Sequence, residues 1–457
     1  MVTVKVNNAS QSWVVDHRFS EFVKLCDEVK KLNKSAASKF PSRFSALLPR
    51  GESALIQQRK NSLNEFLAAI CREKPLLAFD SVVKFLKLDE QSESSPSKDG
   101  GDEQHIPLGI FDRKKSSPAD FRFIKVVGKG SFAKVLQAEH LAEGKLYAIK
   151  VIDKQDVVRR REVRHVMAER SILQRNKQHP FLVRLHYAFQ TRDKLYFVLD
   201  FVNGGELFHH LQKDRRFSLE RTRFYACEIA SALGFLHSQN IIYRDLKPEN
   251  ILLDSEGHIV LTDFGLCREG DVAGTFCGTP EYLAPEVLKK ERYTRAVDWW
   301  CLGCVTFEML CGLPPFYSRD HQKMYNAILN DNLSFPAAAS LPADAKAMLT
   351  GLLDKDPLTR MGSSKDLTEL QSHPFFAAVN WDRIVRKELT PPFRPRVANA
   401  GDVTEIDAEF TNQPIPESVR QENDTPDPSS SYANQFQGFT FVPPSDMQQQ
   451  PLDAVTE

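Results

Sequence analysis

The sequence predicts a mixed α+β protein built from several domains. Alternating apolar runs on either side of a glycine-rich turn within 121–152 indicate a β-rich part. Later in the chain, the apolar run 297–302 has helical character. A stretch rich in Ser, Pro, Gly and Asp at 89–119 separates both from an earlier globular segment. We therefore expect a β-rich part followed by a helical part, with a smaller α+β domain before them.

The length of 457 residues corresponds to about three domains. The composition divides the chain into a globular segment at 1–88, a flexible linker at 89–119, a large domain at 120–376 and a proline-rich tail at 377–457. Within the tail, 421–431 and the glutamine run 448–450 are low in complexity. No internal repeat is found.

The charges cancel, because 60 basic residues face 60 acidic ones, so nucleic acid is not an expected partner. The eight cysteines lie mostly in apolar surroundings and residues 1–12 lack an apolar signal core, which favours the reducing cytosol. Cys301 and Cys304 have the spacing of a zinc ligand pair, but no second pair accompanies them, so a place in the core is the preferred interpretation. No segment approaches the ~20 apolar residues of a membrane span.

The most informative segment is Tyr-Arg-Asp-Leu-Lys-Pro-Glu-Asn at 243–250, followed after a short β-type stretch by Asp-Phe-Gly at 263–265. Two carboxylates and an amide at this spacing can orient a hydroxyl nucleophile and hold Mg²⁺ against nucleotide phosphates. Asp245 would accept the hydroxyl proton, and Asn250 and Asp263 would hold the metal. The segment therefore indicates phosphoryl transfer.

A glycine-rich loop at 128–135 precedes this segment, between the predicted strands 123–127 and 135–139. Backbone amides in such a loop can approach phosphates closely. A third strand at 147–152 places Lys150 where it can pair with the α- and β-phosphates of a nucleotide. The loop and the lysine precede the catalytic segment in the order that a kinase requires.

Three further features that a kinase requires follow Lys150 along the chain. Glu169 lies on a predicted helix, where it can pair with Lys150, Glu286 ends an Ala-Pro-Glu motif, and Arg360 is a candidate buried partner for Glu286. Asp298 lies in the apolar run 297–302. Alone, a glycine loop can be an ordinary hairpin and a Lys–Glu pair a solvated contact. Chance does not account for all the parts in this order.

The Tyr before Arg-Asp, and Thr-Phe-Cys-Gly-Thr-Pro-Glu-Tyr at 275–282, resemble the AGC group of serine/threonine protein kinases. The segment 195–208 is similar to the serum- and glucocorticoid-regulated kinases within it. The resemblance implies a bilobal kinase fold, with a small β-rich N-lobe and a large helical C-lobe, that uses ATP and Mg²⁺. The implied catalytic residues are Lys150, Glu169, Asp245, Lys247 and Asn250.

The resemblance also implies a nucleotide site, in which the Asp200 carbonyl and the Val202 amide meet the adenine edge and Leu252 forms the floor. Two positions depart from the family pattern, Ala133 in place of the third loop glycine and Ile406 in place of a phenylalanine over the nucleotide. The full set of implied nucleotide contacts is Val127, Gly128, Lys129, Gly130, Ser131, Phe132, Ala133, Lys134, Val135, Ala148, Lys150, Asp200, Val202, Glu206 and Leu252.

The first segment alternates like a strand at 2–6 and 13–15, then becomes helical from 18–22 and again around 57–71. It resembles a phox-homology domain, which binds phosphoinositides. The family's first strand is expected to be missing and the loop at 49–56 is short. The implied lipid contacts are Arg18 for the 3-phosphate, Phe19 under the inositol ring, Arg59 for the ring hydroxyls and Arg50 at the membrane face.

Arginine suits this role because its planar fork holds phosphate through two hydrogen bonds. The alternative is that these arginines are ordinary surface charge. With phosphatidylinositol 3-phosphate as the ligand, we expect a cytoplasmic protein held peripherally on early endosomes or other phosphoinositide-bearing vesicles.

Substrate choice is implied by acidic residues. Glu206 and Glu249 match family positions that pair with an arginine three residues before the target, while Glu281 and Glu308 are candidates for a more distant arginine. The expected consensus is Arg-x-Arg-x-x-Ser/Thr. For Glu281 and Glu308 the alternative is structural ion pairing.

Thr275 occupies the family's activation-loop phosphosite, which upstream kinases, including a phosphoinositide-dependent kinase, would modify. A phosphate adds roughly −1.5 to −2 charge and needs cationic partners. Arg244, Arg268 and His165 are the candidates. Phosphate held by all three would favour pairing of Lys150 with the Glu169 helix, although the loop 269–274 is shorter than in relatives.

The tail carries Phe-Gln-Gly-Phe-Thr-Phe at 436–441, which resembles the AGC hydrophobic motif with a phosphosite at Thr440. Chance aromatic residues in a low-complexity tail are the alternative. Thr425 before proline is a candidate turn-motif phosphosite. The expected function is a serine/threonine kinase; the alternative is a catalytically weak phosphoinositide-binding scaffold, against which the presence of Lys150, Asp245, Asn250 and Asp263 argues.

Overall fold

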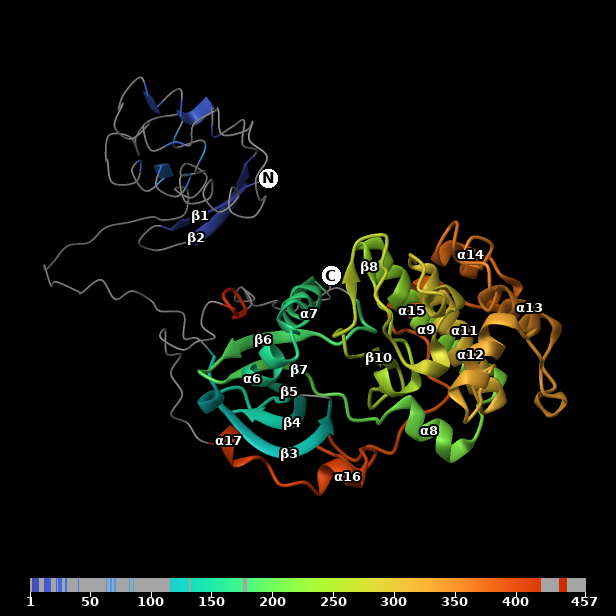
Figure 1. Ribbon diagram of the computed structural model, residues 1–457. Coiled ribbons are helices and arrows are strands. Elements are labelled where there is room, and N and C mark those ends of the chain that lie inside the picture. The colour runs from blue at the N-terminus through green and yellow to red at the C-terminus, as the bar shows by residue number, and fades with distance from the viewer. Residues whose placement is uncertain are drawn as a thin grey trace, which may run out of the picture. The chain divides into compact units, whose positions relative to one another are not determined.

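The computed structural model describes residues 2–7, 12–17, 116–130, 133–175, 179–420 and 435–441, and single positions between 22 and 85. The chain forms two compact units, Met1–Ile110 and Phe111–Glu457 (Figure 1). Several predictions lie outside the described residues: Ser131 and Phe132 in the glycine-rich loop, the lipid contacts Arg18, Phe19, Arg50 and Arg59, and the phosphosite Thr425.

The first unit contains an antiparallel hairpin of β1 (Val2–Asn7) and β2 (Ser12–His17), as the alternating pattern predicts. Its described helical positions include Phe22 and Phe66, both fully buried. The ring of Phe22 lies 4.9 Å from that of Phe85 in an edge-to-face arrangement, a favourable geometry for two aromatic rings. Most of the apolar side chains described at these positions are likewise buried.

The second unit begins with a five-stranded antiparallel sheet in the order β3-β4-β5-β7-β6. The strands predicted around the glycine-rich loop form β3 and β4, and the predicted lysine strand forms β5. Each is somewhat longer than predicted, because pairing with its neighbours extends the apolar runs. The bounds are β3 Phe121–Lys129, β4 Ala133–His140, β5 Leu146–Asp153, β6 Leu185–Gln190 and β7 Lys194–Asp200.

Two helices follow β5: α6 (Lys154–Arg159) and α7 (Val163–Arg175). The side chain of Asp153 accepts a hydrogen bond from the Gln155 amide and so caps α6. The buried face of α7 carries Ile172, which joins a core shared with Phe197 of β7. Glu169 lies on this buried face, so the helix presents a carboxylate to the sheet.

The remainder of this unit is mainly helical, and Figure 1 shows the sheet on one side and these helices on the other. The longest, α9 (Leu219–Ser238) and α11 (Ala296–Cys311), are largely buried and pack together. Shorter helices surround them: α8 Leu207–Asp214, α10 Pro285–Leu288, α12 His321–Asn330, α13 Ala343–Leu352, α14 Leu367–Gln371 and α15 Trp381–Val385. Single 3₁₀ turns occupy Pro118–Asp120, Pro248–Asn250, Pro280–Tyr282, Ala337–Ala339 and Pro374–Phe376.

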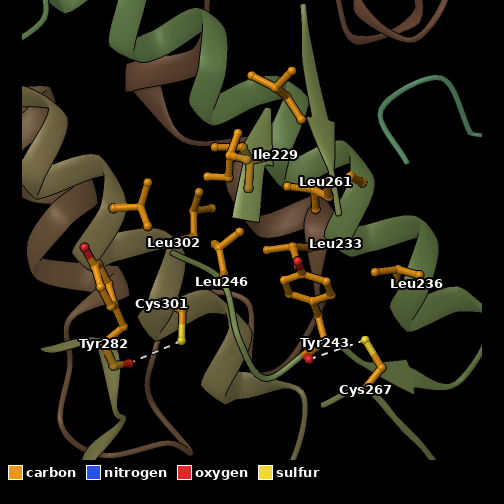
Figure 2. Close-up of a cluster of buried hydrophobic side chains, with 14 of the residues drawn as sticks. Ile229, Leu233, Leu236, Tyr243, Leu246, Leu261, Cys267, Tyr282, Cys301 and Leu302 are labelled. Carbon is orange, nitrogen blue, oxygen red and sulfur yellow. Dashed lines mark hydrogen bonds between the residues drawn. The ribbon is translucent and has the colours of Figure 1, made fainter. Parts of the chain in front are cut away.

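Two small antiparallel pairs flank the predicted catalytic segment. They are β9 (Ile251–Leu253) with β10 (Ile259–Leu261), and β8 (Ile241–Ile242) with β11 (Arg268–Glu269). Beneath them lies the apolar cluster of Figure 2, where the Cys267 thiol donates to the Tyr243 carbonyl and the Cys301 thiol to the Tyr282 carbonyl. Both cysteines are thus core residues. Among the described residues no cluster of three or more His, Cys, Asp or Glu side chains is arranged to hold a metal.

The predicted pair of Glu286 and Arg360 is present. Arg360 is fully buried, and its two terminal nitrogens donate to the Glu286 carboxylate at 2.6 and 2.9 Å. The tail then returns along the sheet, where α16 (Ala408–Thr411) lies near β3 and α17 (Glu417–Arg420) follows. In the described part of the chain, no helix is both long and apolar enough to cross a membrane.

Candidate active site

A cavity of about 820 Å³ lies between the sheet and the helical part of the second unit. Its volume is within the range of small-molecule sites. The described residues of the predicted nucleotide site that line it are Val127, Gly128, Lys129, Gly130, Ala133, Val135, Ala148, Lys150, Asp200, Val202, Glu206 and Leu252. Lys134 does not line the cavity. Ala133 begins β4, and its carbonyl accepts a hydrogen bond from the Gly130 amide at 2.8 Å, so the loop closes with alanine at this position.

Lys150 lies on β5 and extends its ammonium group toward two carboxylates. Its Nζ is 2.7 Å from Glu169 Oε1 on α7 and 3.3 Å from Asp263 Oδ1. Burial of Nζ alone would lower the pKa of Lys150, but the charges of Asp263 and Glu169 outweigh burial and the pKa is raised. The lysine is therefore positively charged and can attract phosphate oxygens.

Asp245 forms the centre of a compact hydrogen-bond network. Lys247 Nζ lies 3.1 Å from its Oδ2, and the Thr279 hydroxyl donates to its Oδ1 at 3.3 Å. Lys247 also donates to the Thr279 hydroxyl at 2.9 Å. Burial raises the pKa of Asp245, although Lys247 opposes this shift. A carboxylate with a raised pKa is a better acceptor for a hydroxyl proton.

Asn250 and Asp263 offer the oxygen atoms that a divalent cation prefers. The Asn250 side-chain nitrogen donates to Asp245 at its carbonyl (2.8 Å) and at Oδ2 (2.9 Å), which leaves the amide oxygen to coordinate. About half of the Asp263 side chain is exposed, and Lys150 lowers its pKa, so it is ionised. These residues therefore fit a magnesium-type ion, which would neutralise phosphate charge.

Asp298 of α11 fixes the backbone at the start of the catalytic segment. Its fully buried carboxylate accepts hydrogen bonds from the backbone amides of Tyr243 and Arg244, both at 2.8 Å. Arg244 has a positive φ of 71°, a backbone conformation that needs such support. His237 also contacts the Asp298 carboxylate at 2.9 Å.

The predicted substrate carboxylates divide into two groups. Glu206 and Glu249 line the cavity, and burial raises the pKa of both, to about 7 for Glu206. Glu249 Oε2 is buried and has no partner among the described residues. Glu281 and Glu308 do not line the cavity. Neither forms an ion pair with a described residue, and Glu308 instead accepts the Tyr282 hydroxyl at 2.6 Å.

Thr275 is exposed, and its carbonyl accepts the Tyr293 hydroxyl at 2.7 Å. Arg244 donates to the same hydroxyl at 3.2 Å, so the Tyr293 hydroxyl links Thr275 to Arg244. His165 pairs instead with Glu162, and Arg268 is exposed on β11. Within the described residues no contact joins either of them to Thr275, so only one of the three predicted cations is brought near.

The segment 435–441 lies against α7 and the sheet. The Phe439 ring is fully buried, 5.0 Å from the ring of Phe197. Arg170 of α7 donates to the carbonyls of Phe439 and Thr440, at 3.1 and 3.3 Å, and Phe441 pairs with Ala188 of β6. This segment therefore binds the helix that carries Glu169.

Comparison with known proteins agrees with this arrangement. A family model described as the protein kinase domain matches residues 121–376, more than half of the chain. The chain belongs to the protein kinase family. A second model, the PX domain, matches residues 5–89 of this kinase. The predicted fold class is thereby confirmed, with a sheet-rich N-lobe and a helical C-lobe after a PX domain.

The curated relatives narrow the family further. Serine/threonine-protein kinase Sgk3 of Rattus norvegicus is 48% identical over 460 residues, which cover 97% of this chain and 92% of that protein. Serine/threonine-protein kinase Sgk1 of Gallus gallus and of Homo sapiens are each 50% identical over 405 residues, covering 86% of this chain and 93% and 94% of theirs. The protein is thus a serine/threonine kinase of the AGC group, a family that uses ATP with a divalent metal.

Sequence reasoning missed part of the site. Thr279 contacts both Asp245 and Lys247, but no catalytic role was predicted for it, although it lies in the AGC-like segment 275–282. The tail residues Asp407 and Phe410 also line the cavity. No sequence periodicity marks them, because their position depends on how the tail crosses both lobes.

Proposed function

We propose that this kinase transfers the γ-phosphate of ATP, held with Mg²⁺ in the cavity, to Ser or Thr in Arg-x-Arg-x-x-Ser/Thr sequences. Lys150 would hold the phosphates, Asn250 and Asp263 the metal, and Asp245 would accept the proton of the substrate hydroxyl. The Asp200 carbonyl at the end of β7 and the Val202 amide just after it would orient adenine. The nucleotide supplies the phosphoryl group, and the protein supplies position and charge.

The observation that carries the substrate proposal is the unpaired acidic wall formed by Glu206 and Glu249. Both line the cavity, and neither forms an ion pair with a described residue. One oxygen of Glu249 is buried and accepts no hydrogen bond from the described residues. An arginine fork can satisfy two carboxylate oxygens at once. Glu281 and Glu308 are the proposed partners of the more distant arginine, for which Glu308 would exchange its bond to Tyr282.

A panel of four peptides tests this proposal, with both arginines, with each alone and with neither. We expect loss of the nearer arginine to raise KM most, and Glu249→Gln to remove most of that difference. Glu256→Gln, at an exposed turn, is the matched control. Asp245→Asn should lose nearly all activity. Equal rates on all four peptides would refute the arginine preference.

We further propose that phosphorylation of Thr275 and Thr440 activates the kinase, with Thr425 as a third site. The Tyr293 hydroxyl joins the Thr275 carbonyl to Arg244, and Arg170 donates to the Thr440 carbonyl, so a phosphate on either threonine would have an arginine nearby. Upstream kinases, including a phosphoinositide-dependent kinase, would add them. Thr275→Ala or Thr440→Ala variants that keep the full activity of the phosphorylated enzyme would contradict this.

The PX domain implies phosphoinositide binding and peripheral membrane association. We propose phosphatidylinositol 3-phosphate as the lipid and early endosomes as the membrane, with Arg18, Phe19, Arg50 and Arg59 as contacts. Full-length protein should sediment with liposomes that contain this lipid and not with phosphatidylcholine alone. Arg18→Ala should abolish the difference, and retained binding would exclude that residue.

A further inference from the structure

A buried amide beside the cavity holds the C-terminal tail. Asn203 follows Val202 directly and is only 5% exposed. Its side-chain nitrogen donates to three tail carbonyls, those of Asn399 (3.1 Å), Asp402 (3.1 Å) and Ala400 (3.4 Å). A side-chain amide has two N–H groups, so both donors of Asn203 are directed to the tail.

A second buried amide reaches the same turn from the sheet. Gln137 of β4 is 3% exposed, and its side-chain nitrogen donates to the Gly401 carbonyl at 2.9 Å. The turn 399–402 is therefore held by one donor from the N-lobe and one from the segment between the lobes. Buried amide donors are costly when unpaired, so both side chains stabilise this position of the tail.

The turn itself is well defined. The Asp402 carboxylate accepts hydrogen bonds from the amides of Ala398 (2.8 Å) and Thr404 (2.9 Å). Just beyond it the tail passes Gly205, which has a positive φ of 84°, and a Cβ at that glycine would lie 2.6 Å from the Glu405 carbonyl. The backbone of the tail thus has no space to shift toward this segment.

Ile406, the next residue, lines the cavity. Its side chain is aliphatic and gains attraction only from close contact, because each atom pair contributes little and the contribution falls quickly with distance. Its contribution to the cavity wall therefore depends on where the turn places it. The Ile406 side chain has no polar group, so it cannot hold its own position in the cavity wall through a hydrogen bond.

We propose that Asn203 and Gln137 are positioning residues for nucleotide binding, which act by holding the turn 399–402 so that Ile406 covers the cavity. This inference rests on the proposed placement of ATP. The two residues do not touch the nucleotide in this proposal. They set its affinity through the tail, and they leave the phosphoryl-transfer step to Asp245 and Lys150.

Steady-state kinetics of the full-length kinase test the proposal, with ATP and peptide varied separately. Asn203→Ala should raise KM for ATP about tenfold, because both N–H groups that hold the tail are lost. Gln137→Leu should raise it about threefold. The turnover at saturating ATP and KM for peptide should stay within about twofold for both. Asn330→Ala, at an exposed asparagine whose side-chain nitrogen donates to Asn326, should change neither constant.

A double-mutant cycle separates action through the tail from a local effect on Val202. If Asn203 acts through Ile406, the variant with both Asn203→Ala and Ile406→Ala should raise KM for ATP no more than the larger single change. An unchanged KM in Asn203→Ala, a loss of turnover with KM unchanged, or two effects that multiply would each overturn the proposal. Lys150→Met tests the placement of ATP separately: retained binding of a fluorescent ATP analogue would refute that placement, whatever Asn203 does.

Discussion

Glu206 should make recognition of basic substrates depend on pH near neutrality. Burial and the nearby carboxylates of Glu249 and Asp407 raise the pKa of Glu206 to about 7. Only the ionised carboxylate attracts an arginine, so the peptide must bind the deprotonated form. Protonated enzyme therefore accumulates as the pH falls below 7, and KM for peptide rises.

The magnitude follows from the fraction of ionised Glu206. With a pKa of about 7, about one enzyme molecule in eleven is ionised at pH 6 and about ten in eleven at pH 8. KM for a peptide should therefore fall about tenfold between these values, equivalent to ~1.4 kcal/mol of binding free energy. The raised pKa of Asp245 affects turnover, so KM and turnover must be measured separately.

The assay uses a peptide with a single arginine, three residues before the target, at saturating ATP from pH 6 to 8. This choice removes the contribution of Glu308, whose pKa burial also raises to about 7. Glu206→Gln should give a high KM at every pH, while Glu256→Gln should follow the wild type. A wild-type KM that does not change with pH, or a slope that is undiminished in Glu206→Gln, would refute the reasoning.

Three further predictions concern the support of the site. Arg360→Ala leaves the buried Glu286 carboxylate unpaired and should lower the free energy of unfolding by about 3–5 kcal/mol in urea titration, whereas the exposed Arg319→Ala should change it little. His237 lies between Asp298 and Asp366, which outweigh the effect of burial and raise the pKa of His237 to about 9. The protonated His237 contributes fully to the free energy of unfolding below pH 6.5, and this contribution should fall by ~3 kcal/mol as the pH rises to 9. The His237→Asn variant should not show this loss. Phe439→Ala should lower kcat/KM by about tenfold or more through loss of a buried ring, and an unchanged kcat/KM would contradict a role for this contact.

Local patterns were enough to predict the centre of the site. The strands around the glycine-rich loop, the strand that carries Lys150 and the helix that carries Glu169 all have regular apolar spacing, and their pairing brings Nζ within 2.7 Å of the carboxylate. The Glu286–Arg360 pair was predictable from the order of the motifs, because the glutamate of Ala-Pro-Glu is followed later in the chain by an arginine that can pair with it. Regular apolar spacing and motif order therefore carry most of this information.

Apart from the motif at 436–441, several contacts that support the site could not be predicted in the same way. Asn203, Gln137 and Thr279 are ordinary polar residues in sequence, and their partners lie far away along the chain or in an irregular loop. Arg221 stacks between the rings of Phe217 and Phe393, at 3.7 and 3.8 Å, for reasons visible only after the tail has docked. Such contacts depend on tertiary position, which no local pattern encodes.

The tail and the activation segment both contact α7, and the two contacts stabilise its position by different amounts. Arg175 at the end of α7 pairs with Glu269 at 3.2 Å, but both side chains are nearly half exposed, and such pairs contribute about 0–1 kcal/mol. Phe439 is fully buried against the same part of the molecule, and loss of a buried phenylalanine costs about 3–5 kcal/mol. Of these two contacts, the tail segment therefore restrains α7, and with it the charge pair of Glu169 and Lys150, more strongly than the activation segment does.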